Sequence, residues 1–208
     1  WSPAQSSRLA SVGQTGGFVW SVDDGLATAT LPGTEIMRLC WHLDGTHVFT
    51  GSSQGEIAVC AAEDGTVAAT LLAGGADKDE VYGLQMLSND GMLAAGAGCQ
   101  VQQWDVNRAA CVSHTTFATV DNGYIFGGEA RNPEGKAYVF NLAARGRALC
   151  TAVSDGTVRL LDSQTLQTIT VLTEHAQRGA PVFGVAIATA SPQLATADSQ
   201  GAVMLWDL

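Results

Sequence analysis

The chain has 208 residues, a formal net charge of −10 and 46% apolar residues, and these values exclude several classes of protein. So much apolar sequence predicts a packed core rather than a disordered chain. The two lysines and eight scattered arginines leave no basic stripe that would bind nucleic acid. No apolar run approaches the ~18 residues that span a bilayer. We therefore expect neither nucleic acid nor a membrane among the direct partners.

The five cysteines lie in apolar, strand-like runs such as RLCW and IAVC, and their number is odd. This is typical of buried free thiols in a reducing compartment, so we expect a cytoplasmic or nuclear protein. No two cysteines have the C-x-x-C spacing, and the four histidines form no ligand cluster with them. We therefore expect no zinc site and no other metal or cofactor. The first ten residues lack the basic flank and apolar core of a signal peptide.

In chain order, the first two stretches of sequence have matching landmarks. Each contains short apolar runs joined by turn residues, which predicts strands rather than helices. Superposing Trp1 on Trp41 also superposes Asp24-Gly25 on Asp64-Gly65, at the same offset of 40 residues. Two landmarks at one offset indicate an internal repeat. The apolar runs lie at 8–13, 17–22 and 26–31 in the first repeat and at 35–45, 46–51, 56–62 and 66–72 in the second.

Three further repeats follow, and the residue that closes the third strand of each one marks the period. The intervals between these residues are 40, 44, 57 and 45, and the long interval predicts an insertion, which we place at 120–136 because this segment is rich in Gly, Asn and Pro. A rival alignment makes Phe140 another third-strand residue, but it leaves 21 residues before Leu161, too few for four strands. The third-strand residues are Trp20, Cys60, Trp104, Leu161 and Trp206, and the repeats of this single domain span 1–33, 34–79, 80–119, 137–175 and 176–208.

These repeats resemble the WD-repeat β-propeller family, whose blades are four-stranded sheets of ~40–45 residues that often end in Trp-Asp. The resemblance implies an all-β chain, a β-propeller of four-stranded antiparallel blades with about five blade units. Trp1 resembles the end of a first strand, so we expect the ring to be incomplete in this chain, with roughly two blades before Trp1. The residues that carry the resemblance are Trp104-Asp105, Trp206-Asp207 and the Asp-Gly turns at Asp24, Asp44, Asp64, Asp90 and Asp155.

In that family, four residues often form a hydrogen-bonded brace within a blade: a Trp in the third strand, a Ser or Thr in the second, an Asp in the turn between them, and a His before the first strand. In the last repeat the resemblance gives Trp206, Thr196 and His175, but Gln200 occupies the turn position six residues before Trp206. In the fourth repeat Asp155 faces a leucine rather than a tryptophan. We therefore expect no repeat to keep all four residues, and we expect the blades to be held mainly by apolar packing.

Candidate partner-binding residues lie in the insertion and at the start of two first strands. Arg131, Asn132 and Lys136 lie in the insertion, and irregular loops on a rigid scaffold often carry function. A tolerated insertion without function is the alternative. Tyr82 and Phe183 begin first strands, near the face that propellers often use for binding. Core packing is the alternative interpretation for both of these residues.

The sequence contains no arrangement that is typical of an enzyme. Its Ser, His and Asp residues lack the spacing of a nucleophile elbow or a catalytic triad, and GGEARNPEGK lacks the Gly-Lys-Ser/Thr ending of a phosphate loop. We expect no catalytic residue, and a protein-interaction scaffold that is a subunit of a larger assembly. One alternative is a substrate receptor of a cullin-type ubiquitin ligase, although WDVNR places Arg108 one residue too late for Trp-Asp-x-Arg. The other is an acidic reader of basic protein tails such as histones.

Overall fold

A computed structural model describes residues 1–118 and 137–208 of the chain. The predicted insertion at 120–136, with Arg131, Asn132 and Lys136, lies outside the described residues. The chain divides into two compact units. Unit 1 contains Trp1–Ala97 and Gln102–Val112, and unit 2 contains Gly98–Val101 and the described part of Ser113–Leu208.

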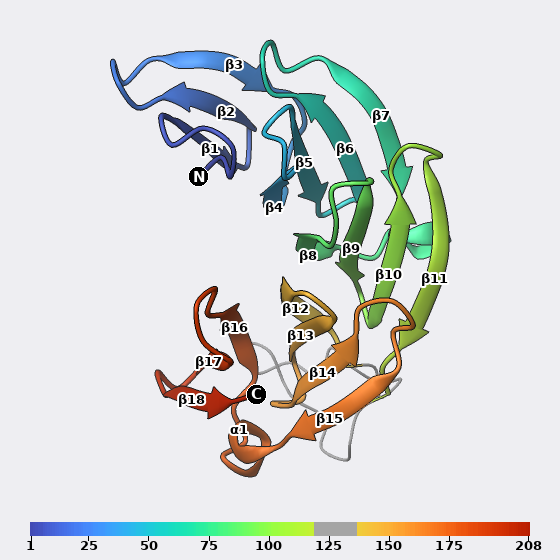
Figure 1. Cartoon of the computed structure of the whole chain (residues 1–208). Helices are drawn as coiled ribbons and strands as arrows, with labels where there is room; N and C mark the ends of the chain where they lie inside the picture. The colour runs from blue at the N-terminus through green and yellow to red at the C-terminus, as the bar shows by residue number, and fades with distance from the viewer. Residues whose placement is uncertain (119–136) are drawn as a thin grey trace. The chain divides into compact units, whose positions relative to one another are not determined.

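Nearly all the regular structure is antiparallel β-sheet, in five sheets whose strands follow one another in chain order (Figure 1). The first sheet contains β1 (Arg8–Gly13), β2 (Gly16–Ser21) and β3 (Ala27–Leu31), and the second contains β4 (Ile36–Trp41), β5 (His47–Ser52), β6 (Glu56–Ala61) and β7 (Val67–Leu72). The third contains β8 (Val81–Met86), β9 (Met92–Ala97), β10 (Gln100–Asp105) and β11 (Ala110–Thr116). The fourth contains β12 (Val139–Arg145), β13 (Ala148–Val153), β14 (Val158–Asp162) and β15 (Thr168–Leu172), and the fifth contains β16 (Val182–Ile187), β17 (Gln193–Asp198) and β18 (Val203–Asp207).

The predicted all-β fold with about five blade units is confirmed by these sheets. The first and fifth sheets have three strands among the described residues, and the other three sheets have four. Two short helical segments lie in the links between sheets: η1 (Gly75–Asp77) follows β7, and α1 (Glu174–Gln177) follows β15. In the described part of the chain, no helix is long and apolar enough to cross a membrane.

Each sheet has two faces, and the core lies where one sheet packs on the next. We name the face that packs on the following sheet the forward face, and the opposite face the backward face. In unit 1, Val19 and Leu31 on the forward face of the first sheet pack with Val48 and Cys60 on the backward face of the second. In unit 2, the forward face of the fourth sheet packs in the same way on the backward face of the fifth, which includes Leu194. Since side chains alternate along a strand, each strand serves both contacts.

The register places the third-strand residues at one equivalent position. Trp20 pairs with Leu9, and Cys60 pairs with Val48. In unit 2 the corresponding pairs are Leu161 with Leu149 and Trp206 with Leu194. Trp104 lies at the same place in β10, next to the end of the strand. All five residues therefore lie on the backward face of a third strand.

None of the five cysteines, all of them among the described residues, forms a disulfide, but they are not all buried. Cys60, Cys99 and Cys150 are buried, and Cys40 is half-buried. Burial raises the pKa of the Cys40 and Cys150 thiols to about 12, so both stay protonated. Cys111 is exposed, which corrects the expectation of five buried thiols. It lies in β11, the outer strand of the third sheet, where one side of the strand faces solvent.

Two equivalent turns in unit 1 use their aspartates as predicted for turn residues. The Leu26 backbone N–H donates to Asp24 Oδ1 at 3.0 Å, and the Thr66 N–H donates to Asp64 Oδ1 at 2.9 Å. Each aspartate precedes a glycine with a positive φ, 72° at Gly25 and 79° at Gly65. The two turns differ in their surroundings, because Gly25 has open space around it while Gly65 lies against the backbone of Thr30.

This difference makes the two glycines a matched pair for substitution. We expect Gly25→Ala to lower the free energy of unfolding by about 1 kcal/mol, the cost of a left-handed residue with a Cβ. Gly65→Ala adds an overlap between the new Cβ and the Thr30 carbonyl, so we expect a loss of about 3 kcal/mol. Urea unfolding of both variants measures the difference. Equal losses would show that the Gly65 turn does not pack closely on the first sheet.

Candidate functional site

The first strand of four sheets has a β-bulge at its second residue. The register between the first and second strands steps over Met37 in the second sheet and Tyr82 in the third. It steps over Phe140 in the fourth sheet and Phe183 in the fifth. A bulge re-aims the side chain of the extra residue relative to the rest of the strand. We name Met37, Tyr82, Phe140 and Phe183 the bulge residues; the first two belong to unit 1 and the last two to unit 2.

The bulge residues are all large and apolar or aromatic, and none of them is buried. Met37 is 40% exposed and Phe183 is 37% exposed, while Tyr82 and Phe140 are half-buried. In unit 2 the rings of Phe140 and Phe183 stack, with their centroids 4.9 Å apart and their planes at 27°. This offset stacking holds two aromatic rings together at the start of β12 and β16. The geometry provides a rigid, half-exposed apolar platform.

In unit 1 the bulge residues lie beside acidic side chains. The Tyr82 hydroxyl donates to the carboxylate of Glu80, and the Tyr82 carbonyl accepts from Arg38 Nε at 2.5 Å. Glu35, two residues before Met37, accepts a hydrogen bond from the Ser53 hydroxyl through its carboxylate. The bulge surface of unit 1 is therefore bordered by carboxylates that hydrogen bonds hold in place.

The fifth sheet contains a buried polar brace of four residues. His175, in α1, lies with Nδ1 2.8 Å from Asp198 Oδ2 and with Nε2 2.7 Å from the Thr196 hydroxyl. Trp206 Nε1 donates to the same hydroxyl at 2.9 Å. With a proton on His175 Nδ1 every group has a partner, because Trp206 then donates to Thr196, Thr196 to His175 Nε2, and His175 Nδ1 to Asp198. The brace ties the link after β15 to the middle of the fifth sheet.

Burial alone would raise the pKa of the Asp198 carboxyl, but hydrogen bonds outweigh that effect. His175 and the backbone N–H groups of Ala202 and Gln200 donate to this carboxylate and lower its pKa below 3.8. Arg178 Nε lies 3.5 Å from Asp198 Oδ2 and adds a positive charge. Asp198 therefore remains ionised in the folded protein at pH values where a free carboxyl would begin to protonate.

The expectation that no repeat keeps all four brace residues is wrong for the fifth sheet. A fixed count back from Trp206 pointed to Gln200, but the Gln200 side chain instead donates to the Arg178 carbonyl at 3.3 Å. The acid is Asp198, at the last residue of β17. The signal that could have found it is the spacing of two between Thr196 and Asp198, which puts both side chains on the same face of a strand.

The fourth sheet replaces this brace with a buried ion pair. Arg159 Nη2 lies 2.9 Å from Asp155 Oδ2 and donates to the Ala118 carbonyl at 3.1 Å. Its guanidinium carbon lies 4.2 Å from the centroid of the Phe117 ring. The Asp155 carboxylate also accepts from the Thr157 hydroxyl at 2.6 Å. Asp155 therefore has a larger role than turn geometry, because it neutralises an arginine that is only 9% exposed.

In the third sheet a glutamine joins the third strand to the link that precedes the sheet. Trp104 Nε1 donates to Gln102 Oε1 at 2.9 Å, and Gln102 Nε2 donates to the Ala73 carbonyl at 2.8 Å. Gln102 lies two residues before Trp104, and Arg159 lies two residues before Leu161, so they occupy equivalent positions. Each reaches a backbone carbonyl in the link that precedes its own sheet.

The predicted strand residues lie in the strands where the sequence placed them. Tyr82 and Phe183 lie in first strands, where the sequence predicted them, and both are bulge residues. The bulge residues Met37 and Phe140 were missed. Trp20 has its own partner, since its Nε1 donates to the Ser11 hydroxyl at 2.8 Å. The remaining third-strand positions, Cys60 and Leu161, are fully buried apolar residues.

A cavity of about 460 Å³ lies between the second and third sheets in unit 1. His42, Asp44, His47 and the fully buried Phe49 are among the residues that line it. Burial works to raise the Asp44 pKa, but hydrogen bonds from Thr46 and His42 lower it to about 2. Among residues 1–118 and 137–208, no group of three or more His, Cys, Asp or Glu side chains could hold a metal ion. The cavity therefore offers no metal centre within the described chain.

The brace makes Thr196 a sensitive position. Thr196→Val keeps the shape but removes the hydroxyl that serves both His175 and Trp206, so we expect a loss of about 2 kcal/mol or more in the free energy of unfolding. Thr50 is the matched control, because it occupies the same position in β5 and its hydroxyl contacts the weakly polar Cys60 thiol. We expect Thr50→Val to cost less than about 1 kcal/mol. Equal losses in urea unfolding would contradict the brace.

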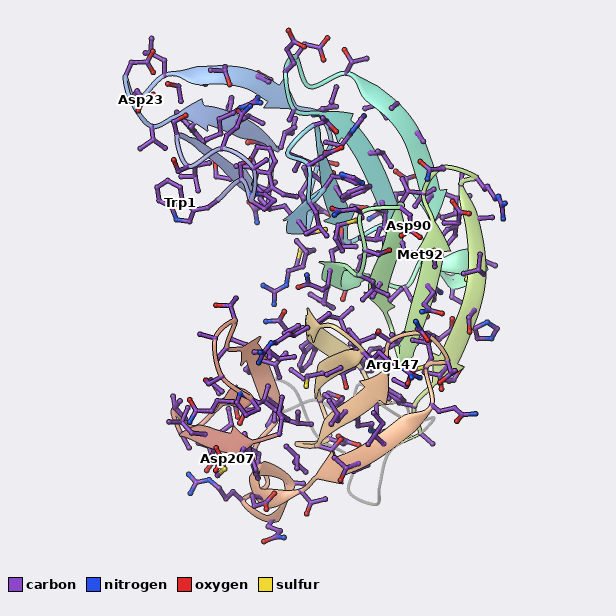
Figure 2. All side chains as sticks on the ribbon, in the orientation of Figure 1. Trp1, Asp23, Asp90, Met92, Arg147 and Asp207 are labelled. Carbon is purple, nitrogen blue, oxygen red and sulfur yellow. The ribbon has the colours of Figure 1, made fainter. Side chains whose placement is uncertain are left out.

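The lowered pKa of Asp198 gives the brace a defined pH dependence. Because the folded pKa lies below the ordinary value of 3.8, the stabilisation is fully present above that pH and is lost as the pH falls through the folded pKa. We expect the stability difference between wild type and Asp198→Asn to shrink on acidification in unfolding curves recorded from about pH 6 to about pH 2. Asp23→Asn, at an exposed turn labelled in Figure 2, is the control and should show no such change.

Comparison with known proteins identifies one repeat directly. Residues 25–69 match the WD40 family model, described as WD domain, G-beta repeat. The matched segment contains β3 of the first sheet, β4, β5 and β6 of the second, and the start of β7. No curated protein matches the sequence.

Solved structures share the fold at low sequence identity. The crystal structure of the computationally designed Ika8 protein matches with a TM-score of 0.71 and 18% identity, over 98% of this chain and 56% of that one. A chain in the crystal structure of the mitotic checkpoint complex matches with a TM-score of 0.78 and 17% identity, over 98% of this chain and 60% of that one. This chain thus spans less than two thirds of each of these two solved chains. The chain therefore resembles WD-repeat β-propellers in the one matched repeat at 25–69, and its five antiparallel sheets have the fold of these solved structures.

Proposed function

We propose that this chain is a non-catalytic scaffold that binds other proteins as a subunit of a larger assembly. A WD repeat in general indicates a role in protein interaction. The observation that supports this role here is the series of bulge residues. Four first strands each direct a large apolar or aromatic side chain out of the regular register, and none of these side chains is buried.

The stacked rings of Phe140 and Phe183 are the strongest anchor of this kind. Aromatic side chains dominate the energy of protein interfaces, because they bury a large area at a small cost in conformational entropy. The stack already fixes both rings, since their centroids lie 4.9 Å apart. A partner that covers them therefore gains apolar contact without ordering either side chain.

A specific observation favours a second function, the reading of basic protein segments. Glu35 and Glu80 border the bulge residues of unit 1, and the chain has a net charge of −10. Such a surface attracts lysine- and arginine-rich segments. The ubiquitin-ligase alternative stays a hypothesis: Arg108, on which it depends, is highly exposed and lies with Nε 3.4 Å from Asp105 Oδ2.

The cysteines support a proposal about location. None of the five, all within the described part of the chain, is in a disulfide, and reducing compartments keep cysteines as thiols. We therefore infer that the chain works in the cytoplasm or the nucleus. The proposal predicts the same unfolding curve with and without a reducing agent, after preparation from its native compartment.

The anchor role of Phe183 is tested by co-purification from the native source, with bound proteins quantified by mass spectrometry. We expect Phe183→Ala to lower the recovery of at least one partner by about tenfold or more, because truncation of an interface anchor typically costs ~2 kcal/mol. Ile169→Ala is the control: Ile169 is 60% exposed but lies in the outer strand β15, away from the bulges. Unchanged recovery of every partner would refute the role of the stacked rings.

The same preparation distinguishes the two functions through salt. If the partners are basic, their binding weakens as NaCl rises from about 0.05 M to about 0.5 M, because salt screens the attraction. We expect Glu80→Gln to weaken the binding of a basic partner further. We expect no effect of Glu63→Gln, because Glu63 lies in the turn between β6 and β7, away from the bulge residues. If the binding of every partner is the same at all salt concentrations and in Glu80→Gln, the chain does not read basic tails. The proposal of a general protein-interaction scaffold is unaffected by that result.

A further inference from the structure

The cavity between the second and third sheets of unit 1 lies at the end of these sheets opposite the bulge residues. Three turns form its polar rim: the β4–β5 turn with His42 and Asp44, the β8–β9 turn with Asn89, and the β10–β11 turn with Asn107. The bulges lie instead at the starts of the first strands. Asp90, labelled in Figure 2, joins two of the turns, because its carbonyl accepts from Asn107 Nδ2 at 2.9 Å. The cavity is therefore separate from the surface of the proposed function.

The Asp44 carboxylate holds the β4–β5 turn with only one of its oxygens. Oδ1 accepts from the Thr46 N–H at 2.8 Å and from the Thr46 hydroxyl at 2.7 Å, and it lies 2.7 Å from His42 Nδ1. No residue that the structure describes donates to Asp44 Oδ2. The side chain of Asp44 is 51% exposed. A ligand can therefore bind a carboxylate oxygen here without breaking any hydrogen bond of the turn.

Two further acceptors line the cavity. Asn107 uses its Nδ2 on the Asp90 carbonyl, and no donor to its Oδ1 lies in the described chain. The contact of His42 Nδ1 with Asp44 Oδ1 places the histidine proton on Nδ1, because two lone pairs would repel at 2.7 Å. His42 Nε2 then carries a lone pair and is an acceptor. No lysine or arginine is among the described residues that line the cavity. The rim therefore offers several acceptors and no positive side chain.

The walls next to this rim are small and apolar. Ala68 and Ala69 of β7 and Val106 after β10 line the cavity, and none of the three is buried. Such walls favour an aliphatic chain, because contact removes apolar surface from water on both sides. The volume of about 460 Å³ lies within the range of roughly 300–1,000 Å³ that is usual for ligand sites. The cavity therefore has room for a long side chain and part of the backbone that carries it.

We propose that this cavity binds an arginine side chain of a partner protein, with the guanidinium at Asp44 and the aliphatic stem along the apolar walls. The rim requires a cation with several N–H donors, and the acceptors lie on two different sheets. The guanidinium has five donors in a planar fork and suits this arrangement better than the single ammonium of lysine. The site uses no bulge residue and goes beyond the proposed function, with which it shares only the premise that the partner is a protein.

The 208-residue chain tests this in calorimetric titrations with two capped peptides, Gly-Ala-Arg-Ala-Gly and the same peptide with citrulline in place of arginine. Citrulline keeps the stem and the planar head but has no charge. We expect the arginine peptide to bind about tenfold more tightly or better, because hydrogen bonds to charged groups are the strong ones. In NMR spectra, the imidazole signals of His42 and His47 shift on binding, since both rings line the cavity, whereas those of His114 and His175 do not.

Asp44→Asn and Asp64→Asn form a matched pair of variants. Both aspartates lie in an Asp-Gly-Thr turn of the second sheet, and in both turns Oδ1 accepts from the threonine N–H, a bond that asparagine keeps. Each variant removes one negative charge, but only Asp44 lines the cavity. We expect Asp44→Asn to abolish most of the preference for arginine over citrulline. Asp64→Asn should bind both peptides like wild type, and equal losses in the two variants would reduce the effect to net charge and reject the site.

A third variant, Ala68→Phe, fills the cavity from β7. Ala68 is exposed, so we expect the thermal unfolding curve of wild type and the loss of binding of both peptides. Equal binding of the two peptides to wild type, or undiminished binding to Ala68→Phe, overturns the proposal. A lysine peptide that binds more tightly rejects arginine as the occupant, and propylguanidinium that binds as tightly as the arginine peptide assigns the cavity to a small cation instead. Phe183→Ala should leave peptide binding unchanged, so a failure here is distinct from a failure of the bulge residues.

Discussion

Contact between sheets is the constraint on which this structure depends. Each described strand has only five to seven residues, and one repeat of such strands cannot bury its apolar faces by itself. The third strand shows the consequence most clearly: Cys60 serves the contact with the preceding sheet, and Val59 serves the contact with the following one. Because one strand supplies both contacts through alternating residues, a shift of register by one residue would disrupt two cores at once.

The links between sheets must therefore hold successive sheets in position, and three sheets do so with different chemistry. Gln102 reaches the Ala73 carbonyl, Arg159 reaches the Ala118 carbonyl, and His175 binds β17 directly. In every case a buried polar side chain joins the link to the middle strands of the sheet that follows. The shared feature is the connection rather than the residue type. This explains how the four-residue brace can be lost from a sheet without loss of the fold.

The strand pattern was predictable because it depends on short-range properties. Apolar runs, Asp-Gly turns and the spacing of Trp20, Cys60 and Trp104 all reflect local turns and strand length. Asp198 was missed because its role depends on a partner, His175, that lies 23 residues earlier and meets it only through the register of β17. The bulges were missed for another reason: the first strands have apolar residues on both faces, so alternation of residue types cannot reveal a step in register. Tyr82 and Phe183 were found by their place at the start of these strands, whereas Phe140 was considered only as a rival third-strand residue.

Two kinds of exposed apolar surface in this chain have different physical origins. A bulge residue stays exposed even where its strand has a first strand of a neighbouring sheet on each side: Met37 is 40% exposed although β4 lies between β1 and β8 in unit 1. A neighbouring sheet therefore does not bury Met37, whereas a molecule that binds at the start of the first strand would cover it. The exposed Phe18 in β2 and Leu205 in β18 lie instead on faces of the type that other sheets in this chain bury against each other. A ligand that binds at the start of the first strands suits the first surface, and a further sheet of the same kind suits the second.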